Sequence, residues 1–162
     1  MQIEPIDLVL FGAGGDLARR KLLPALMHLE FDELLPEKLR ILALSREETN
    51  VENFMAGQKA TLQAYLGEQR WSKALWDKFC ERVHYVRVEF TAVEQYEALH
   101  QHLDPAHTSV FYFATPPSLF QAICENLSAA GCLNQNSRVV LEKPIGRDFN
   151  NCKEVNQTVG EF

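Results

Sequence analysis

Two kinds of hydrophobic pattern alternate along this chain. Short apolar runs rich in β-branched and aromatic residues predict strands, at residues 8–11, 40–44, 84–88, 109–114 and 138–141. Longer segments with apolar residues every three or four positions predict helices, from about residue 16 to 29 and at 51–65, 71–80, 96–103, 117–130 and 149–159. Pro24 lies inside the first helix, so we expect a kink or a break near Leu23. This alternation predicts an α/β fold with a doubly wound, mostly parallel sheet.

A cluster of glycines joins the first strand to the first helix. Gly12, Gly15 and Ala18 have the spacing G-x-x-G-x-x-A, whereas a fingerprint that begins Gly12-x-Gly14 would place the bulky Leu17 where a small residue is needed. In doubly wound proteins such a loop lets a pyrophosphate approach the backbone and the positive end of the helix. Glycines after a strand also serve simply as a turn, so their place between strand and helix is what favours a nucleotide site.

The end of the second predicted strand indicates which nucleotide is bound. An acidic residue there would bind the ribose hydroxyls and repel a 2′-phosphate, but this chain has Ser45 and Arg46. A guanidinium is permanently charged and matches phosphate geometry, which favours NADP over NAD. The alternative is a solvated loop arginine beside Glu47 and Glu48.

Further candidate ligand contacts each have a plain structural alternative. Lys21 lies about one helical turn past the glycine loop, in reach of a phosphorylated ligand, although basic runs such as residues 19–21 are usually solvated. Thr115 and Pro116 follow the fourth strand at the edge where ligands bind, but prolines there also explain a stiff turn. Lys143 follows the fifth strand and is either a substrate or nicotinamide contact or a surface charge.

Composition and charge narrow the class of partner. The 162 residues are 46% hydrophobic and 23% charged, which suits one globular domain over residues 1–162. A net charge of −6 excludes a global basic field for nucleic acid or an anionic membrane, and no apolar run has membrane-spanning length. The chain has four cysteines, none with the spacing of a metal site: Cys80, Cys124, Cys132 and Cys152. We therefore expect no bound metal, and we expect reduced thiols in a cytoplasmic protein.

No histidine is expected at the ligand edge. Three lie on predicted helices, and His84 and His107 stand at the starts of strands. Because oxidising an alcohol by hydride transfer needs a proton acceptor, usually histidine, the chain has no evident catalytic base. No strand follows the last predicted helix, so we expect a domain that lacks its final strand, with an exposed sheet edge and a tendency to self-associate.

Four segments resemble the glucose-6-phosphate dehydrogenase family, in order and in spacing: residues 11–26, 44–46, 113–117 and 140–146. The resemblance implies a Rossmann-type NADP-binding domain, followed in the family by a larger α+β catalytic domain. It implies a cytoplasmic homo-oligomer that oxidises the C1 hydroxyl of glucose 6-phosphate to 6-phosphogluconolactone with reduction of NADP, at the start of the oxidative pentose phosphate pathway.

The same resemblance implies roles for individual residues. The pyrophosphate would lie on Gly12, Ala13, Gly14, Gly15, Asp16 and Leu17, and the 2′-phosphate on Arg46 with Ser45 beside it. Glu89 and Phe90 would border the adenine or ribose, and Thr115 and Pro116 the nicotinamide half. Lys143 would lie between nicotinamide and sugar, and Lys21 near the substrate.

Two departures from the family pattern matter. The family usually has serine or lysine where this chain has Gly14, so one phosphate contact is absent. The family's R-I-D-H-Y-L-G-K segment, which holds the substrate phosphate and orients a histidine base, is absent too, so we expect no catalytic residue here and an inactive chain. Two alternatives remain: a sugar dehydrogenase of the glucose–fructose oxidoreductase type, and a nucleotide-binding module without catalysis.

Overall fold

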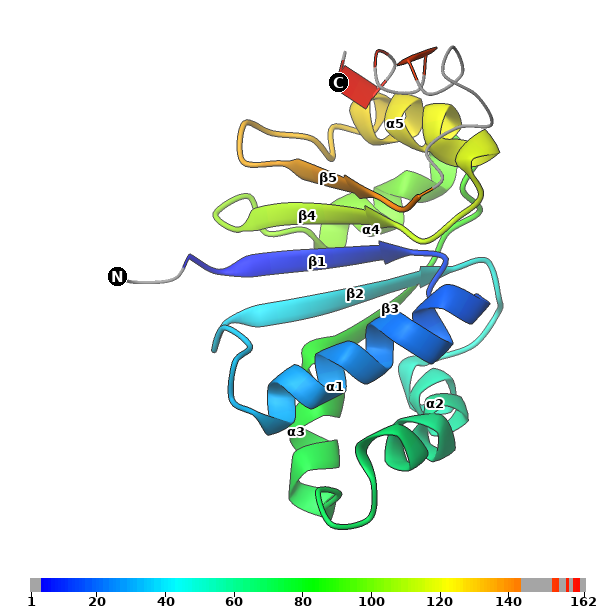
Figure 1. Cartoon of the computed structure of the whole chain (residues 1–162). Coiled ribbons are helices and arrows are strands. Elements are labelled where there is room, and N and C mark those ends of the chain that lie inside the picture. The colour runs from blue at the N-terminus through cyan, green and yellow to red at the C-terminus, as the bar shows by residue number, and fades with distance from the viewer. Residues whose placement is uncertain (1–3, 144–152, 155–156, 158, 161–162) are drawn as a thin grey trace.

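Five parallel strands form one sheet in this computed structural model, which describes residues 4–143, 153–154, 157 and 159–160. The strand order is β3-β2-β1-β4-β5, and every neighbouring pair is parallel (Figure 1). The strands are β1 (Ile6–Phe11), β2 (Leu39–Ser45), β3 (Val83–Arg87), β4 (Thr108–Phe113) and β5 (Arg138–Leu141). The predicted doubly wound α/β fold is confirmed. The chain order reverses between β1 and β4, which is where open α/β sheets bind ligands.

The first helix runs on through Pro24, where a kink or a break was expected, but its hydrogen-bond pattern changes just before the proline. A π-helical turn, Ala18–Leu22, precedes α1 (Leu23–Phe31), and the N–H of Leu23 donates to the carbonyl of Ala18, five residues earlier. A proline ring clashes with the carbonyl four residues before it and has no N–H to donate, so the wider turn relieves both problems. The turn lies directly behind the glycine loop.

The remaining helices largely follow the apolar pattern. They are α2 (Val51–Leu66), α3 (Lys73–Arg82), α4 (Tyr96–His102) and α5 (Phe120–Ala129), with 3₁₀ turns at Val93–Gln95 and Pro117–Leu119. The side chains of Asn50 and Ser72 accept hydrogen bonds from backbone N–H groups three residues later and so begin α2 and α3. The helix expected over 149–159 lies mostly outside the described residues; positions 153–154, 157 and 159 are helical.

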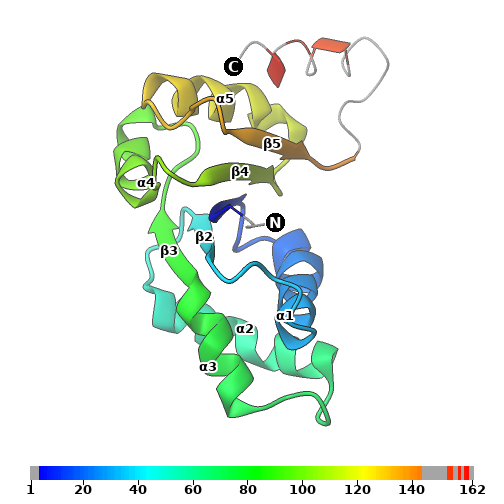
Figure 2. The ribbon, with the colours of Figure 1, turned by 90° about the vertical axis from the view of Figure 1, so that its left-hand side faces the viewer.

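Two hydrophobic layers cover the two faces of the sheet. Figure 2 shows α1, α2 and α3 on one side and α4 and α5 on the other. Alternate residues of the strands serve the two layers: Leu10 and Ile41 pack against the first set of helices, and Phe11 and Phe111 against the second. The central strands β1 and β2 are buried at most positions and are therefore mostly apolar, which is why the sequence revealed them.

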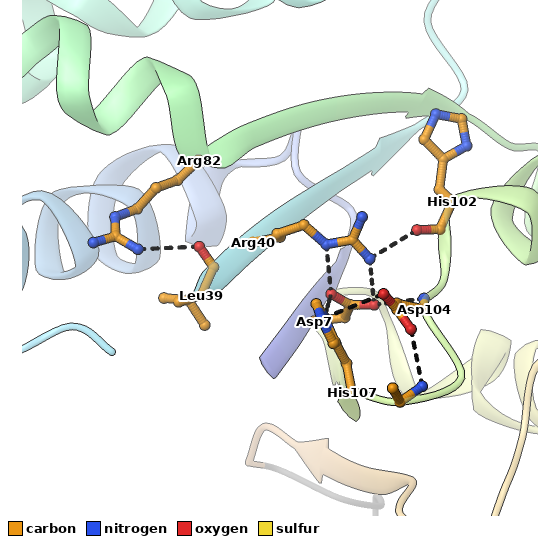
Figure 3. Close-up of polar contacts among 8 residues, drawn as sticks. Asp7, Leu39, Arg40, Arg82, His102, Asp104 and His107 are labelled. Atoms are coloured by element: carbon orange, nitrogen blue, oxygen red, sulfur yellow. Dashed lines mark hydrogen bonds and ion pairs between the residues drawn. The ribbon is translucent and has the colours of Figure 1, made fainter. Parts of the chain in front are cut away.

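The edge of the sheet where the strands begin is closed by a buried carboxylate. Asp7 is completely buried and accepts hydrogen bonds from Arg40 at 2.7 and 2.8 Å, from His107 Nδ1 at 2.8 Å and from the N–H of Asp104 at 3.0 Å (Figure 3). Arg40 also donates to the carbonyl of His102 at 3.0 Å. These contacts join β1, β2 and the segment that enters β4. His107 therefore lies at the edge opposite the glycine loop.

Candidate functional site

The glycine loop passes too close to its neighbours for larger residues. Gly12 has a positive φ of 83°, and a Cβ there would lie 2.6 Å from the carbonyl oxygen of Ala114. A Cβ on Gly15 would lie 3.1 Å from the carbonyl oxygen of Gly12, which accepts the N–H of Gly15 at 2.9 Å. Gly12 is therefore favoured by both its backbone conformation and the lack of space, and Gly15 by the lack of space alone.

Backbone N–H groups in this loop are left without acceptors. The N–H groups of Gly12 and Ala13 donate to the carbonyl of Leu44 at 3.1 and 2.9 Å, which fastens the loop to β2. The N–H groups of Gly14, Asp16 and Leu17 donate to no backbone or side-chain acceptor among the described residues. Unpaired N–H groups at the start of a helix attract an anion, because the helix dipole adds to their partial positive charge.

The loop forms one wall of a cleft of about 600 Å³ across the carboxyl ends of β1 to β4. The cleft brings together most of the residues proposed as coenzyme contacts: Gly12, Gly14, Gly15, Ser45, Arg46, Glu89, Phe90, Thr115 and Pro116. Glu47, Thr91, Ala114 and Leu119 also line it, although the sequence did not single them out as contacts. Ala13, Asp16, Leu17, Lys21 and Lys143 are not part of its lining.

The loop after β2 places groups of opposite charge in the cleft. Arg46 is exposed, and its guanidinium has no ion-pair partner among the described residues. Glu47 points toward the glycine loop, since its Oε1 lies 3.5 Å from where a Cβ on Gly14 would be. Tyr85 fixes this loop by donating its hydroxyl to the carbonyl of Glu47 at 2.7 Å. The cleft therefore holds the guanidinium of Arg46 together with the carboxylates of Glu47 and Glu89.

Ser45 supplies a hydroxyl where the family pattern has one in the glycine loop. Ser45 is 7% exposed, and its Oγ lies 3.0 Å from where a Cβ on Gly14 would be. A serine at position 14 would therefore crowd Ser45. The Ser45 hydroxyl thus lies close to the position that a side chain at residue 14 would occupy.

The opposite side of the cleft has a buried hydroxyl without a partner. Thr115 Oγ1 is buried and makes no hydrogen bond within the described part of the chain. Because an unsatisfied buried hydroxyl costs free energy, its place in a cleft points to a ligand that completes it. The prolines that follow stiffen this turn, as the sequence suggested.

The structure does not place either of the two lysines proposed as substrate contacts in the lining of the cleft. Lys21 is exposed on the π-helical turn, and Lys143 is exposed just after β5. The hydroxyl of Tyr112 donates to the carboxylate of Glu142, which holds the start of this segment against β4. Burial, and then the contact with Glu142, raises the pKa of Tyr112 to about 12, so the phenol keeps its proton.

Comparison with known proteins decides the family. Residues 9–162 match the family model described as "Glucose-6-phosphate dehydrogenase, NAD binding domain". The chain belongs to the glucose-6-phosphate dehydrogenase family. The glucose-6-phosphate 1-dehydrogenase of Rhizobium meliloti is 35% identical over 161 residues, which are 98% of this chain and 33% of that protein.

Solved structures of the family have the same fold. The glucose-6-phosphate 1-dehydrogenase of Mycobacterium avium has a TM-score of 0.89 and 28% identity, over 98% of this chain and 34% of that one. A glucose-6-phosphate dehydrogenase in complex with glucose 6-phosphate has a TM-score of 0.83 and 25% identity, over 99% of this chain and 35% of that one. The chain spans about a third of the length of these relatives, and the match covers their nucleotide-binding domain.

The remaining features of the described residues concern metal binding, thiols, another hollow and membranes. Among the described residues, no three His, Cys, Asp or Glu side chains are grouped to hold a metal ion. Cys80, Cys124 and Cys132 are free thiols, and Cys152 lies outside the described residues. A hollow of about 490 Å³ between α2 and α3 has no glycine loop beside it. None of the described helices is long and apolar enough to span a bilayer.

Proposed function

We propose that this chain is the coenzyme-binding domain of an NADP-dependent glucose-6-phosphate dehydrogenase. The whole protein then oxidises the C1 hydroxyl of glucose 6-phosphate to 6-phosphogluconolactone in the oxidative pentose phosphate pathway. The observation that carries the proposal is the unpaired guanidinium of Arg46 in the same cleft as a glycine loop with free N–H groups. Membership of the family favours this reaction over that of glucose–fructose oxidoreductases.

The residues of the cleft fit a dinucleotide phosphate. The free N–H groups of Gly14, Asp16 and Leu17 bind the pyrophosphate, and the absence of a Cβ at Gly12 leaves room for the turn. Ser45 and Arg46 bind the 2′-phosphate, Ser45 by its hydroxyl and Arg46 by its charge. Ala13, which is buried and outside the lining, contributes shape only.

The two halves of the coenzyme lie on opposite sides of β1. The ends of β2 and β3, with Arg46 and Glu89, receive the adenosine half, and the ends of β4 and β5 receive the nicotinamide half. There Thr115 offers its unpaired hydroxyl, Pro116 packs against the ring, and the exposed Lys143 reaches nicotinamide or sugar. Lys21 contributes positive charge toward the sugar phosphate. When bound, the coenzyme supplies the hydride acceptor.

We propose that the chain binds coenzyme but does not catalyse. None of the described histidines lines the cleft, and His107 is bonded to Asp7 at the opposite edge. The base that accepts the hydroxyl proton must then come from another part of the protein, as the greater length of the relatives allows. Assembly as a homo-oligomer and location in the cytoplasm belong to the same proposal.

Calorimetric titration of this chain with NADP and with NAD tests the proposal. We expect tighter binding of NADP, and a Kd for NADP raised about tenfold or more in Arg46→Ala, because a charge-assisted contact with phosphate is lost. The Kd for NAD should not change. Arg138→Ala, which removes an exposed arginine at the opposite edge of the sheet, is the matched control.

Two results would contradict the proposal. Tighter binding of NAD, or an Arg46→Ala variant with unchanged affinity for NADP, would rule out Arg46 as the 2′-phosphate ligand. NADPH formation from glucose 6-phosphate by the chain alone would disprove the predicted lack of activity.

A further inference from the structure

Side chains from outside the cleft hold the turn that follows β3. Residues 89–91 of this turn line the cleft. The carbonyl oxygen of Phe90 accepts two hydrogen bonds, from the Tyr96 hydroxyl at 2.8 Å and from Asn126 Nδ2 at 3.0 Å. The N–H of Glu89 donates to Gln95 Oε1 at 2.8 Å. Three side chains from the 3₁₀ turn, α4 and α5 therefore fix two successive residues of the cleft wall.

The same turn is tied to the glycine loop through buried rings. The ring of Phe90 packs edge-on against that of Phe11, with centroids 5.4 Å apart, and Phe11 directly precedes Gly12. Tyr96 is fully buried and stacks on the other side of this cluster, 6.2 Å from Phe11. Burial raises the pKa of Tyr96, so its hydroxyl keeps the proton that it donates to Phe90. Moving the turn would therefore disturb the aromatic cluster beneath the loop.

The position of the turn decides which half of the coenzyme it serves. In the sheet β3 lies beyond β2, on the side of β1 away from β4 and β5. The turn after β3 thus stands beside Arg46 and faces the adenosine half. A buried carbonyl that loses its donors pays a desolvation cost, and the turn would shift to reach water.

We propose that Gln95, Tyr96 and Asn126 are positioning residues that keep the wall at residues 89–90 preformed for the adenosine half of the coenzyme. The proposal rests on the proposed function and extends it to residues that do not line the cleft. Preforming a wall raises affinity because the binding energy is not spent on ordering it.

The test is the double variant Tyr96→Phe with Asn126→Leu, which removes both donors to the Phe90 carbonyl and keeps the side-chain bulk. The control is Tyr65→Phe with Gln121→Leu: Tyr65 is exposed on α2, and the exposed Gln121 lies on α5, where it donates to Glu125. Titrations use NADP, adenosine 2′,5′-bisphosphate and nicotinamide mononucleotide, with hydrogen exchange read at the N–H groups of Glu89 and Ala92.

The expected result separates positioning from general destabilisation. In the double variant the Kd values for NADP and for adenosine 2′,5′-bisphosphate both rise about tenfold, as the loss of fixed hydrogen bonds predicts. The Kd for nicotinamide mononucleotide stays the same, and exchange at Glu89 and Ala92 becomes faster. The control variant changes none of these values.

Each other outcome has a distinct meaning. Equal losses for both half-ligands would show general destabilisation, and faster exchange without a change in Kd would show that the turn is held but does not position the coenzyme; either overturns the proposal. If the unaltered chain bound no coenzyme at all, both the proposed function and the proposed positioning role would fail.

Discussion

Replacing Gly12 with alanine tests whether the close approach of β1 to the end of β4 shapes the site. A Cβ on Gly12 would lie 2.6 Å from the carbonyl oxygen of Ala114 and 3.2 Å from Thr115 Cγ2. The backbone carbonyl cannot rotate away as a side chain would. The turn that carries Thr115 must therefore move, or the glycine loop must.

The structure also provides a control for the backbone conformation. Gly12 has a φ of 83°, and Gly131, which follows α5, has a φ of 69° with nothing within 4 Å of its Cβ position. Alanine at a positive φ costs about 1–2 kcal/mol, so Gly131→Ala should lose that much stability. Overpacking adds about 1–3 kcal/mol, so Gly12→Ala should lose about 2–5 kcal/mol in total.

Urea unfolding followed by circular dichroism measures the two losses under the same conditions. The difference between them isolates the contact with Ala114, because both variants bear the cost of a positive φ. Coenzyme titration then completes the comparison. Gly12→Ala should weaken binding of NADP, since both the loop and the Thr115 turn line the cleft, whereas Gly131→Ala should leave binding unchanged.

A small difference would refute the reasoning. If Gly12→Ala lost no more stability than Gly131→Ala, within about 0.5 kcal/mol, the close approach to Ala114 would have no energetic consequence. If the loss were large and binding of NADP stayed normal, the loop would be strained but its shape would not matter for the coenzyme.

Three further predictions concern charge and burial. Burial raises the pKa of Asp7, but the hydrogen bonds from Arg40, Asp104 and His107 outweigh burial and lower the pKa below its unfolded value of 3.8. The ionised Asp7 carboxylate therefore stabilises the folded chain above pH 3.8, and this contribution is lost as the pH falls through the folded pKa. Asp7→Asn should thus lower the free energy of unfolding by about 3 kcal/mol at neutral pH, as urea unfolding measures, and should make stability fall less steeply as the pH is lowered. If stability fell with pH as it does in the unaltered chain, this reasoning would be wrong. Glu47→Gln should lower the Kd for NADP about threefold or more relative to NAD in calorimetry, because a carboxylate no longer faces the 2′-phosphate, and an unchanged ratio would place Glu47 outside that subsite. Burial raises the pKa of both Cys124 and Cys132 to about 11, so iodoacetamide should modify neither in the folded chain, as peptide mass mapping can show; rapid labelling before unfolding would disprove it.

Local signals were enough to predict most of the fold. The central strands β1 and β2 were visible because they are mostly buried and apolar, and Pro24 marked the point where the first helix changes its hydrogen-bond pattern. The start of β1 was missed by two residues, since the sheet begins at Ile6 and includes the charged Asp7. Asp7 is tolerated there because Arg40 neutralises it and because groups far away in sequence, including His107 and the N–H of Asp104, hydrogen-bond to it. No local pattern reveals such a contact.

In the candidate site, too, local signals predicted some residues and missed those that depend on contacts between distant elements. The glycine loop and Arg46, which line the cleft, could be proposed because each follows a strand at a position with a known physical use. Glu47 was taken only as a neighbouring charge, and its approach to Gly14 depends on how two strands pair. Asn126 gave no signal, because its partner Phe90 is 36 residues away and on another element. Contacts between distant elements are what the sequence alone could not supply.

The two edges of the sheet differ in how well their polar groups are satisfied, and this difference locates the function. Where the strands begin, the buried Asp7 carboxylate has all its bonds within the chain. Where they end, loop N–H groups, the Arg46 guanidinium and Thr115 Oγ1 lack partners among the described residues. The buried Thr115 hydroxyl costs stability in the free protein, whereas the exposed Arg46 guanidinium is solvated by water. A ligand that binds only the folded chain stabilises it, so coenzyme at a hundredfold excess over Kd should raise the free energy of unfolding by about 2.7 kcal/mol. The first edge is built to hold the strands together, and the second to bind.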